Sequence, residues 1–586
     1  MKNIFKTIGL VSILGLLTAC SSDLLDLSPY DRVSSSTMWT TENLADKGVM
    51  AVYSSLRKGY CGISPYVLEQ FAASMSPRNG SPALLIGNCT SSNGIFSSMW
   101  MDNYEGINRA NEAIANLPNA PLPDSKKARL MAECKFLRAW FYYNLNCVFK
   151  GVPLYTEPTV LENYNKGRSS ETDIWNQINS DLSDAINESN LPNKYAAGDG
   201  NYGRITKGAA YALRGKVNLW LKNYAQAEQD FKAVGNCGYS LFQGGYKQLF
   251  KEANEQCDEM IFSVQCIGLS GYGQELSFRY GTRSSFGSCW NNYFPSTDFV
   301  DHYSYANGKP FDWDEVIPGY TSMTPEARAV YFLRDNMTKS EKASLAAKGA
   351  DMSKYLDSGN EARIKKAYED RDPRLQQTII TPYSQYLGAN GSTEYTFTLR
   401  WPYRADINEP HDLRTDTNAF FYYLYRKFVA EGASEIPNRG YSPIDVPLIR
   451  YADVLLGLAE ALNEQGKADG AIEYVNMIRT RAGVAELNSN EYTQVSSQVD
   501  LRSKIREERR IEFNGEGVTF FDELRWGTWK DVVFSNHLGQ GPGLKQCWGQ
   551  ITEAYSYQGS YIEKWAIPAT ECERNSNLTQ NEGWIN

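Results

Sequence analysis

Apolar side chains recur at helical spacing along much of the chain. The longest amphipathic stretch, 128–149, stops before a glycine and a proline, residues that commonly end a helix. A second helix is predicted over 171–188, because Ser170 and Asp173 have the spacing of a capping box. The pattern therefore predicts a mainly α-helical protein.

Two separate segments have the pattern of paired helices. Residues 208–221 and 224–234 form the first pair, with Gly215 and Phe231 where tetratricopeptide repeats place a small and an aromatic packing residue. The second pair lies within 452–481, where apolar residues recur at i, i+3, i+4, i+7 and i+10. One hairpin cannot bury its apolar face alone, so we expect the hairpins to stack with the other helices into a scaffold.

The segment between the hairpins has a different character. Thirteen aromatic residues lie between 268 and 320, separated by Gly, Ser and Asn without a helical or strand period. Long irregular segments are commonly functional or disordered, and the aromatic content argues against disorder. We therefore predict an irregular, loop-rich ligand-binding region. For any single ring, packing onto the scaffold is at least as good an interpretation as ligand contact. The candidate ligand contacts are Trp290, Tyr293, Tyr303, Trp313 and Tyr320.

A polar turn and two aspartates add further candidates. Arg78, in the turn 76–80, can donate hydrogen bonds to sugar hydroxyls, and a plain exposed turn is the competing interpretation. Asp312 and Asp314 flank Trp313 and can accept from hydroxyls or coordinate calcium, but they fall short of an EF-hand pattern. A structural calcium ion therefore stays open, and no other cofactor is predicted.

The first residues have the pattern of an export signal. Two lysines precede an apolar stretch, 8–17, that is shorter than the roughly 20 residues needed to span a membrane. Leu17-Thr18-Ala19-Cys20 follows and resembles the lipobox of bacterial lipoproteins, in which the cysteine is acylated. The sequence thus predicts a signal peptide over 1–19 and a lipid anchor on Cys20, and an ordinary signal peptide beside a chance cysteine is the alternative.

Composition argues against several classes of protein. The net charge of −9 argues against nucleic-acid binding, which needs clustered Lys and Arg. Ten cysteines remain after Cys20 without a CxxC pair, and the histidines lack His or Cys neighbours at ligand spacing, so zinc and iron–sulfur sites are not predicted. An exported protein can form disulfides, but the sequence assigns no pairs. The mixed charges of 502–512 predict a solvated, salt-bridged helix face.

Several sequence motifs resemble those of the SusD/RagB family of outer-membrane nutrient-binding lipoproteins. They are Asp370-Arg371-Asp372-Pro373-Arg374-Leu375, Ile449-Arg450-Tyr451-Ala452-Asp453-Val454-Leu455-Leu456, Ile505-Arg506-Glu507-Glu508-Arg509-Arg510-Ile511-Glu512-Phe513, Phe521-Asp522-Glu523-Leu524-Arg525-Trp526-Gly527 and Asn577-Leu578-Thr579-Gln580-Asn581. No single motif establishes the resemblance, but the order and spacing of the motifs together are specific. One departure is Asp453, where the family usually has a glutamate.

The resemblance implies a mainly α-helical body with tetratricopeptide-like hairpins on one side and irregular ligand-binding loops on another. It implies a lipid-anchored protein of the outer membrane, facing the cell exterior, that captures an oligosaccharide or polysaccharide and delivers it to a SusC-like TonB-dependent transporter. Some family members capture peptides or other nutrients instead. On this basis the chain divides into a signal peptide (1–19), an N-terminal helical region (20–235), a loop-rich, aromatic-rich region (236–440) and a C-terminal region (441–586).

The sequence favours binding over catalysis. A surface glycoside hydrolase would need a paired acid and nucleophile or base, and no hydrolase signature is present. A pure scaffold that holds another protein is a third hypothesis, in which loss of Trp290 and Trp313 would leave every ligand affinity unchanged. We therefore predict a nutrient-binding module without enzymatic activity.

Overall fold

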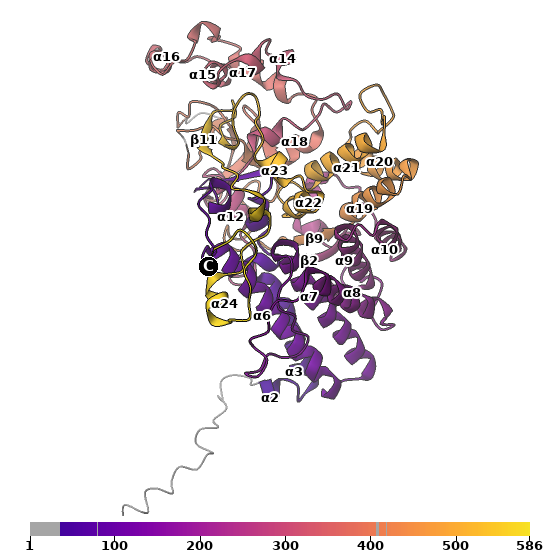
Figure 1. Ribbon diagram of the computed structural model, residues 1–586. Helices are drawn as coiled ribbons and strands as arrows, with labels where there is room; N and C mark the ends of the chain where they lie inside the picture. The colour runs from indigo at the N-terminus through magenta and orange to yellow at the C-terminus, as the bar shows by residue number, and fades with distance from the viewer. Residues whose placement is uncertain (1–34, 79, 406–409, 418, 586) are drawn as a thin grey trace, which may run out of the picture.

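The computed structural model describes residues 35–78, 80–405, 410–417 and 419–585 (Figure 1). The predicted signal peptide and Cys20 lie outside the described residues. None of the helices within the described ranges combines the length and apolar character needed to cross a membrane.

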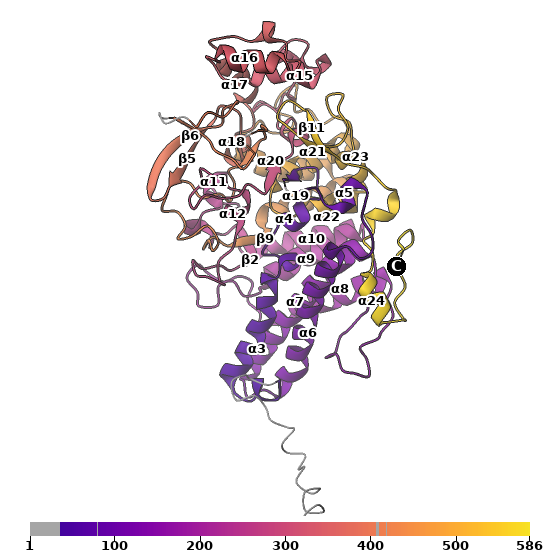
Figure 2. The ribbon, with the colours of Figure 1, turned by 90° about the vertical axis from the view of Figure 1, so that its left-hand side faces the viewer.

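A bundle of long helices forms the lower half of the molecule (Figures 1 and 2). It contains α3 (Glu42–Ser54), α6 (Gly94–Asn116), α7 (Asp124–Phe149) and α8 (Glu171–Asn187). From Phe136 onwards every residue of α7 is buried, because α6 and α8 both pack against it. The predicted capping box of Ser170 and Asp173 is present and begins α8. Both long helices predicted from the pattern are therefore confirmed.

The two predicted hairpins are present and pack on each other. The first consists of α9 (Lys207–Trp220) and α10 (Tyr224–Asn236), and the second of α19 (Tyr451–Glu464) and α20 (Ala468–Ala482). Helix α10 contacts α19, and Phe231 lies at this contact. A Cβ atom added at Gly215 would lie 2.5 Å from the Phe231 ring, and one added at Gly457 would lie 2.8 Å from it. The two glycines thus let α9, α10 and α19 close around one aromatic ring.

Short strands join distant parts of the chain. β2 (Met260–Val264) pairs antiparallel with β9 (Val446–Arg450), which leads directly into α19. The other strand pairs are β1 (Met75–Pro77) with β3 (Tyr293–Pro295), β4 (Ile379–Ile380) with β8 (Leu424–Tyr425), and β10 (Gly543–Lys545) with β11 (Ile551–Ala554). A three-stranded sheet contains β5 (Gln385–Asn390), β6 (Thr393–Thr398) and β7 (His411–Asp412).

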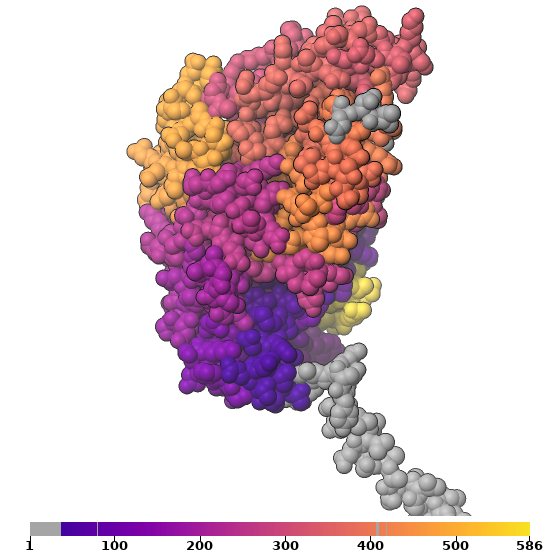
Figure 3. All heavy atoms as spheres, turned by 180° about the vertical axis from the view of Figure 1, so that it is seen from behind, coloured from indigo at the N-terminus to yellow at the C-terminus, as the bar shows by residue number. Residues whose placement is uncertain are grey.

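The upper half is formed largely by the middle of the chain, as the space-filling view in Figure 3 shows. Most elements there are short and connected by irregular loops, as predicted for the loop-rich region. The other α-helices among the described residues are α2 (Ser35–Met38), α4 (Tyr66–Glu69), α5 (Ala83–Ile86), α11 (Tyr246–Leu249), α12 (Leu276–Tyr280), α13 (Thr297–Val300), α14 (Trp313–Val316), α15 (Pro325–Ala329), α16 (Lys339–Ala346), α17 (Asn360–Lys365), α18 (Pro373–Thr378), α21 (Gln498–Phe513), α22 (Thr519–Trp526), α23 (Trp529–Val533) and α24 (Ala569–Arg574).

Part of the helix face over 502–512 lies in a buried ionic cluster, although the sequence predicts a solvated face there. Glu512, on α21, is buried. Its carboxylate accepts hydrogen bonds from Arg374 (Nη1···Oε2, 3.0 Å) and Arg450 (Nη1···Oε1, 3.1 Å) and also pairs with Arg481. Burial raises the pKa of Glu512, but the three arginines outweigh burial and hold that pKa at about 2. The prediction of an exposed face is wrong here because the partners come from remote segments.

The end of the chain returns to the helix bundle, with α24 beside α6 (Figure 1). Asn581 donates from Nδ2 to the carbonyl oxygens of Phe149 (3.0 Å) and Trp565 (2.8 Å). The backbone N–H of Trp565 donates to the carbonyl oxygen of Val148 (2.9 Å). These bonds satisfy carbonyls at the end of α7, which have no partner within the helix. Distant parts of the chain pack together here. The division of the sequence into four segments therefore stays a prediction.

Candidate ligand-binding surface

Three of the predicted ligand residues come together at one short strand pair. β1 pairs antiparallel with β3 in a register that places Pro77 opposite Tyr293. The pairing continues through the Arg78 N–H, which donates to the carbonyl oxygen of Asn292 (2.8 Å). Trp290 lies in the loop just before β3. A turn near the N-terminus and a loop from the middle of the chain therefore form one surface.

The Trp290 loop is held firmly by its backbone. The backbone N–H of Trp290 donates to the carbonyl oxygen of Phe278 (3.1 Å), and the backbone N–H of Cys289 donates to that of Thr282 (2.9 Å). Ser288 and Asn291 have φ of +58° and +37°, a left-handed conformation that is uncommon outside glycine. The Trp290 side chain nevertheless remains 39% exposed. The loop thus presents a fixed indole to solvent, with little ordering left for a ligand to impose.

The indole is supported by a cationic and aromatic stack. The Phe278 ring lies 4.7 Å from the Trp290 ring, centroid to centroid. The guanidinium carbons of Arg439 and Arg279 lie 4.7 and 5.4 Å from the Phe278 centroid. Arg439 also donates from Nη1 to the carbonyl oxygen of Gly287 (2.5 Å). One side of Trp290 therefore rests on a rigid support, and the exposed part is available to a flat ligand.

Arg78 is fixed by a carboxylate from a third segment. Arg78 Nη2 lies 3.2 Å from Asp416 Oδ2, and the same carboxylate accepts a hydrogen bond from Arg283. The Asp416 N–H donates to the side-chain oxygen of Asn291 (3.1 Å). Burial lowers the pKa of Arg78 while Asp416 opposes that shift, and an arginine keeps its charge at neutral pH. The site therefore presents oriented N–H donors beside the exposed indole.

Tyr293, on β3, is half-buried beside this surface. Its ring stacks on Tyr66 with centroids 4.8 Å apart. Burial raises the pKa of the Tyr293 hydroxyl, so the phenol stays neutral and can donate or accept a hydrogen bond. The residues that form the Arg78–Trp290 surface are Arg78, Phe278, Arg283, Trp290, Tyr293, Asp416 and Arg439.

Three other predicted ligand contacts are core residues, which corrects the prediction. Tyr303 and Tyr320 are 0% exposed, and Trp313 is 3% exposed. Trp313 stacks on Tyr320 with centroids 4.3 Å apart, and its Nε1 donates to Asp301 Oδ2 (2.9 Å). A long segment without regular structure still needs a hydrophobic core, and these rings supply it.

The aspartates beside Trp313 have local structural roles. Asp312 Oδ1 accepts the Asp314 N–H (2.8 Å) and caps α14, while Asp314 Oδ1 accepts the Thr321 N–H (2.9 Å). Within the part of the chain that the structure describes, no group of three or more His, Cys, Asp or Glu side chains could hold a metal ion. The ten cysteines of that part are free thiols.

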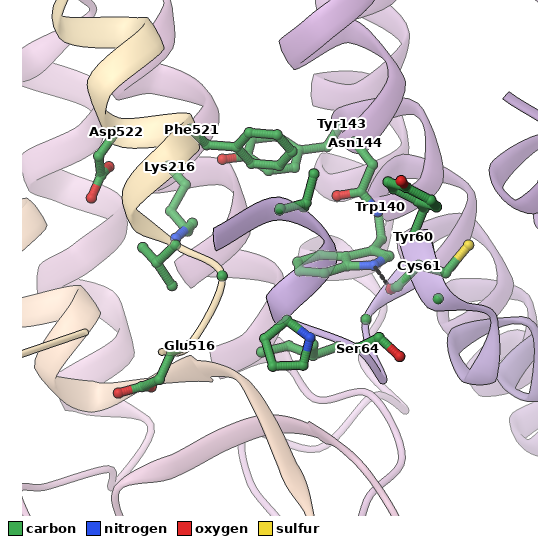
Figure 4. Close-up of a pocket in the computed structure, with 17 residues that line it drawn as sticks. Tyr60, Cys61, Ser64, Trp140, Tyr143, Asn144, Lys216, Glu516, Phe521 and Asp522 are labelled. Carbon is green, nitrogen blue, oxygen red and sulfur yellow. Dashed lines mark hydrogen bonds between the residues drawn. The ribbon is translucent and has the colours of Figure 1, made fainter. Parts of the chain in front are cut away.

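A small cavity and a larger hollow lie away from this surface. The one in Figure 4 has a volume of about 60 Å³ between Tyr60, Trp140 and Lys216, and the Trp140 Nε1–H donates to the carbonyl oxygen of Cys61 (2.8 Å). Ligand pockets usually occupy roughly 300–1,000 Å³, so this space fits water rather than a sugar. A larger hollow of about 740 Å³ beside α6 is lined by Trp100, Tyr104, Tyr155 and Tyr164, and the Tyr104 hydroxyl donates to the Pro153 carbonyl (2.7 Å). None of the ligand contacts predicted from the sequence lies in it.

Comparison with known proteins decides the family. Residues 258–584 match the model of the SusD family, more than half of the chain. The chain belongs to the SusD family. Residues 23–219 of this SusD-family chain also match a model described as "Starch-binding associating with outer membrane".

Relatives and solved structures agree with this assignment. The SusD-like protein P38 of Formosa agariphila is 25% identical over 543 residues, covering 89% of this chain and 91% of the relative. The starch-binding protein SusD of Bacteroides thetaiotaomicron is 23% identical over 490 residues, covering 79% and 74%. A SusD-like protein from Bacteroides fragilis superposes with a TM-score of 0.73 at 23% identity, covering 95% of this chain and 100% of that chain. A laminarin binding SusD-like protein has a TM-score of 0.61 at 22% identity, covering 93% and 100%. The predicted SusD-like fold is confirmed.

The sequence of this SusD-family protein did not reveal the residues that fix Trp290 and Arg78. Phe278 is one of the thirteen aromatic residues of its segment, but no period distinguishes it from the rings that pack inside. Arg283, Asp416 and Arg439 lie in loops without any motif. Their role follows only from the pairing of β1 with β3 and the contacts around it.

Proposed function

We propose that this SusD-family protein binds a carbohydrate at the Arg78–Trp290 surface without chemically changing it. The observation that carries the proposal is the exposed, rigidly held Trp290 beside the fixed guanidinium of Arg78. A flat aromatic ring packs against the apolar face of a sugar, and guanidinium N–H groups donate to its hydroxyls. The names of the starch-binding relative and of the laminarin-binding structure support the same class of ligand.

The charges of the surface support binding rather than hydrolysis. A glycosidase needs two carboxyl groups across the scissile bond, one of them protonated. Asp416 is held by Arg78 and Arg283, and the nearby Glu275 pairs with Arg279 (2.6 Å). Both carboxylates are therefore engaged with arginines rather than placed as a free pair across a sugar bond.

A binding panel of carbohydrates tests the proposal. The probe protein is the soluble chain 21–586, compared with Trp290→Ala and with Tyr164→Ala, an exposed aromatic residue beside the larger hollow. Loss of a central aromatic contact costs about 1 kcal/mol or more, so Trp290→Ala should weaken binding roughly five-fold or more. Tyr164→Ala should bind like the unaltered chain. Binding to no carbohydrate, or release of shorter sugars by the purified protein, would overturn the proposal.

We further propose that Cys20 carries lipid and anchors the protein to the outer membrane, facing the cell exterior. Two or more acyl chains hold a protein stably on a membrane, whereas one chain does not. Cells fed labelled palmitate should label the full chain but not Cys20→Ala, while Cys237→Ala serves as a matched control. Label retained on Cys20→Ala would contradict the anchor.

The proposed partner is a SusC-like TonB-dependent transporter that receives the carbohydrate. The family assignment supports this partner. Tagged full-length protein, purified in mild detergent from outer membranes, should bring the transporter with it. Purification of the lipidated protein alone from cells that express the transporter would contradict a stable complex.

A further inference from the structure

A second hollow with aromatic walls lies near the Arg78–Trp290 surface. Its volume is about 310 Å³, within the range of ligand pockets. It opens between the main body and the short helices α15 and α16, which stand at the top of the molecule in Figure 2. We call it the Trp401–Trp548 hollow. Its principal lining residues are Trp401, Phe420, Trp548, Gln550, Glu326 and Lys348.

The floor of this hollow is aromatic and well ordered. The Trp401 and Trp548 rings lie 5.8 Å apart, centroid to centroid, and Trp548 stacks on Phe421 at 6.2 Å. Phe420 stands at the edge and is 45% exposed. Phe420 therefore adds an accessible apolar ring to the lining of the hollow.

Polar groups at the floor leave donors for a ligand. Gln550 Oε1 accepts from Trp548 Nε1 (3.2 Å) and from Gln546 Nε2 (3.2 Å). This arrangement fixes the Gln550 amide, whose own Nε2 has no acceptor among the described residues, and neither has the indole N–H of Trp401. Exposed Glu326 and Lys348 at the rim bring charges of both signs. Neutral donors among apolar rings match sugar hydroxyls better than they match a charged ligand.

One short segment connects the hollow with the Arg78–Trp290 surface. Asp416 pairs with Arg78, and Phe420 follows four residues later, so their Cα atoms lie at most about 14 Å apart. Tyr422 stacks on Phe294, the neighbour of Tyr293 on β3, with centroids 4.5 Å apart. A narrow cavity lined by Thr415, Thr417 and Tyr422 also borders Trp401 and Phe420. The hollow and the Arg78–Trp290 surface are thus neighbours in the fold.

We propose that the Trp401–Trp548 hollow binds a second portion of the same carbohydrate chain that lies on Trp290. The inference rests on the proposed function and narrows it, because the ligand must then be an extended chain of several sugar units. A chain long enough to reach both places binds the second one intramolecularly, at a high effective concentration. Short oligosaccharides gain only the contacts at Trp290.

Affinity as a function of chain length tests this inference. The probes are size-graded fragments of the polysaccharide that the soluble chain binds, beginning with maltodextrins and laminari-oligosaccharides. Phe420→Ala and Gln550→Ala change side chains that are not buried, and Leu387→Ala is the control at an exposed apolar residue elsewhere. The unaltered chain should bind long fragments more tightly than short ones. Phe420→Ala should weaken the binding of long fragments about five-fold and leave the affinity for the shortest fragments unchanged. Trp290→Ala should weaken the binding of fragments of every length.

The outcomes separate this inference from the proposed function. Carbohydrate binding that depends on Trp290 but not on chain length or Phe420 overturns the inference and leaves the proposed function intact. A Phe420→Ala variant that loses affinity equally at every length also overturns it. Failure of every carbohydrate to bind the unaltered chain overturns both.

Discussion

Arg78 and Asp416 are joined by an ion pair in which Nη2 and Oδ2 lie 3.2 Å apart, although one residue lies near the N-terminus and the other beyond the middle of the chain. The same carboxylate also binds Arg283. Asp416 therefore fixes two cations from separate loops at the place where Trp290 is exposed.

We expect Asp416→Ala to weaken carbohydrate binding several-fold, because Arg78 and Arg283 would lose their shared anchor and bind with greater entropic cost. The thermal midpoint should fall as well, since the side chains of Arg78 and Asp416 are only 18% and 17% exposed and two arginines lose a partner. Isothermal titration with the panel ligand measures the effect. Glu315→Ala, which removes an exposed pair with Lys309, is the control. Equal affinity of Asp416→Ala and the unaltered chain would show that this anchor is unnecessary.

The packing of Phe231 predicts a large effect of one added methyl group. Gly215→Ala places a Cβ atom 2.5 Å from the buried Phe231 ring, and overpacking of this kind costs about 1–3 kcal/mol. Gly94→Ala is the matched control, since its Cβ atom would meet nothing within 4 Å. Urea denaturation should show a lower midpoint for Gly215→Ala only. A midpoint equal to that of the unaltered chain would mean that the helices can shift to make room.

The ionic cluster around Glu512 predicts acid sensitivity. Burial raises the pKa of Glu512, but the surrounding arginines outweigh burial and lower that pKa from its ordinary value of 4.5 to about 2. The carboxylate therefore stabilises the fold at all pH values above about 4.5, and this contribution is lost as the pH falls towards 2. Glu512→Gln should destabilise the protein by about 3 kcal/mol at pH 7, the lower end of the range for a broken buried ion pair. Each of the three arginines loses one carboxylate but keeps another, such as Glu508 for Arg374 and Glu259 for Arg450 and Arg481.

Denaturation at several pH values checks this prediction. The difference in unfolding free energy between Glu512→Gln and the unaltered chain should be constant from pH 7 to pH 5 and shrink below that. A difference that stays constant down to pH 3 would contradict the assigned pKa shift.

Glu523 on α22 predicts the opposite pH dependence. It is fully buried, and its nearest cation is Arg510, with Nε 3.7 Å from Oε1. Burial raises the pKa of Glu523 to about 8, which Arg510 only partly offsets. The folded protein thus keeps a proton that the unfolded chain releases above about pH 4.5, so stability falls as the pH rises from 4.5 to 8. Glu523→Gln should match the unaltered chain near pH 5 and exceed its thermal midpoint at pH 9. A lower midpoint at pH 9 would refute the assignment.

The scaffold could be predicted from the sequence because its signal is local. Apolar residues at helical spacing define α7, α8 and both hairpins, and the capping box at Ser170 begins its helix as expected. Gly215 and Phe231 belong to one hairpin, so their contact also follows from the repeat pattern.

The site could be predicted only in part because its contacts are long-range. Trp290, Tyr293 and Arg78 do meet, but Trp313 and Tyr320 have the same kind of sequence around them and lie in the core. In a segment without a period, nothing in the sequence says which side of a ring faces solvent. The partner of Arg78 depends on loops that only the folded chain brings together.

The hydrogen bond from Asn581 to the end of α7 limits how early during synthesis this helix end can be fully packed. The Phe149 carbonyl is synthesised 432 residues before Asn581, which donates to it together with Arg168. A chain released at any point between them exposes that helix end and the surface that Trp565 covers. The end of α7 can therefore reach its final packing only after residue 581 has been synthesised.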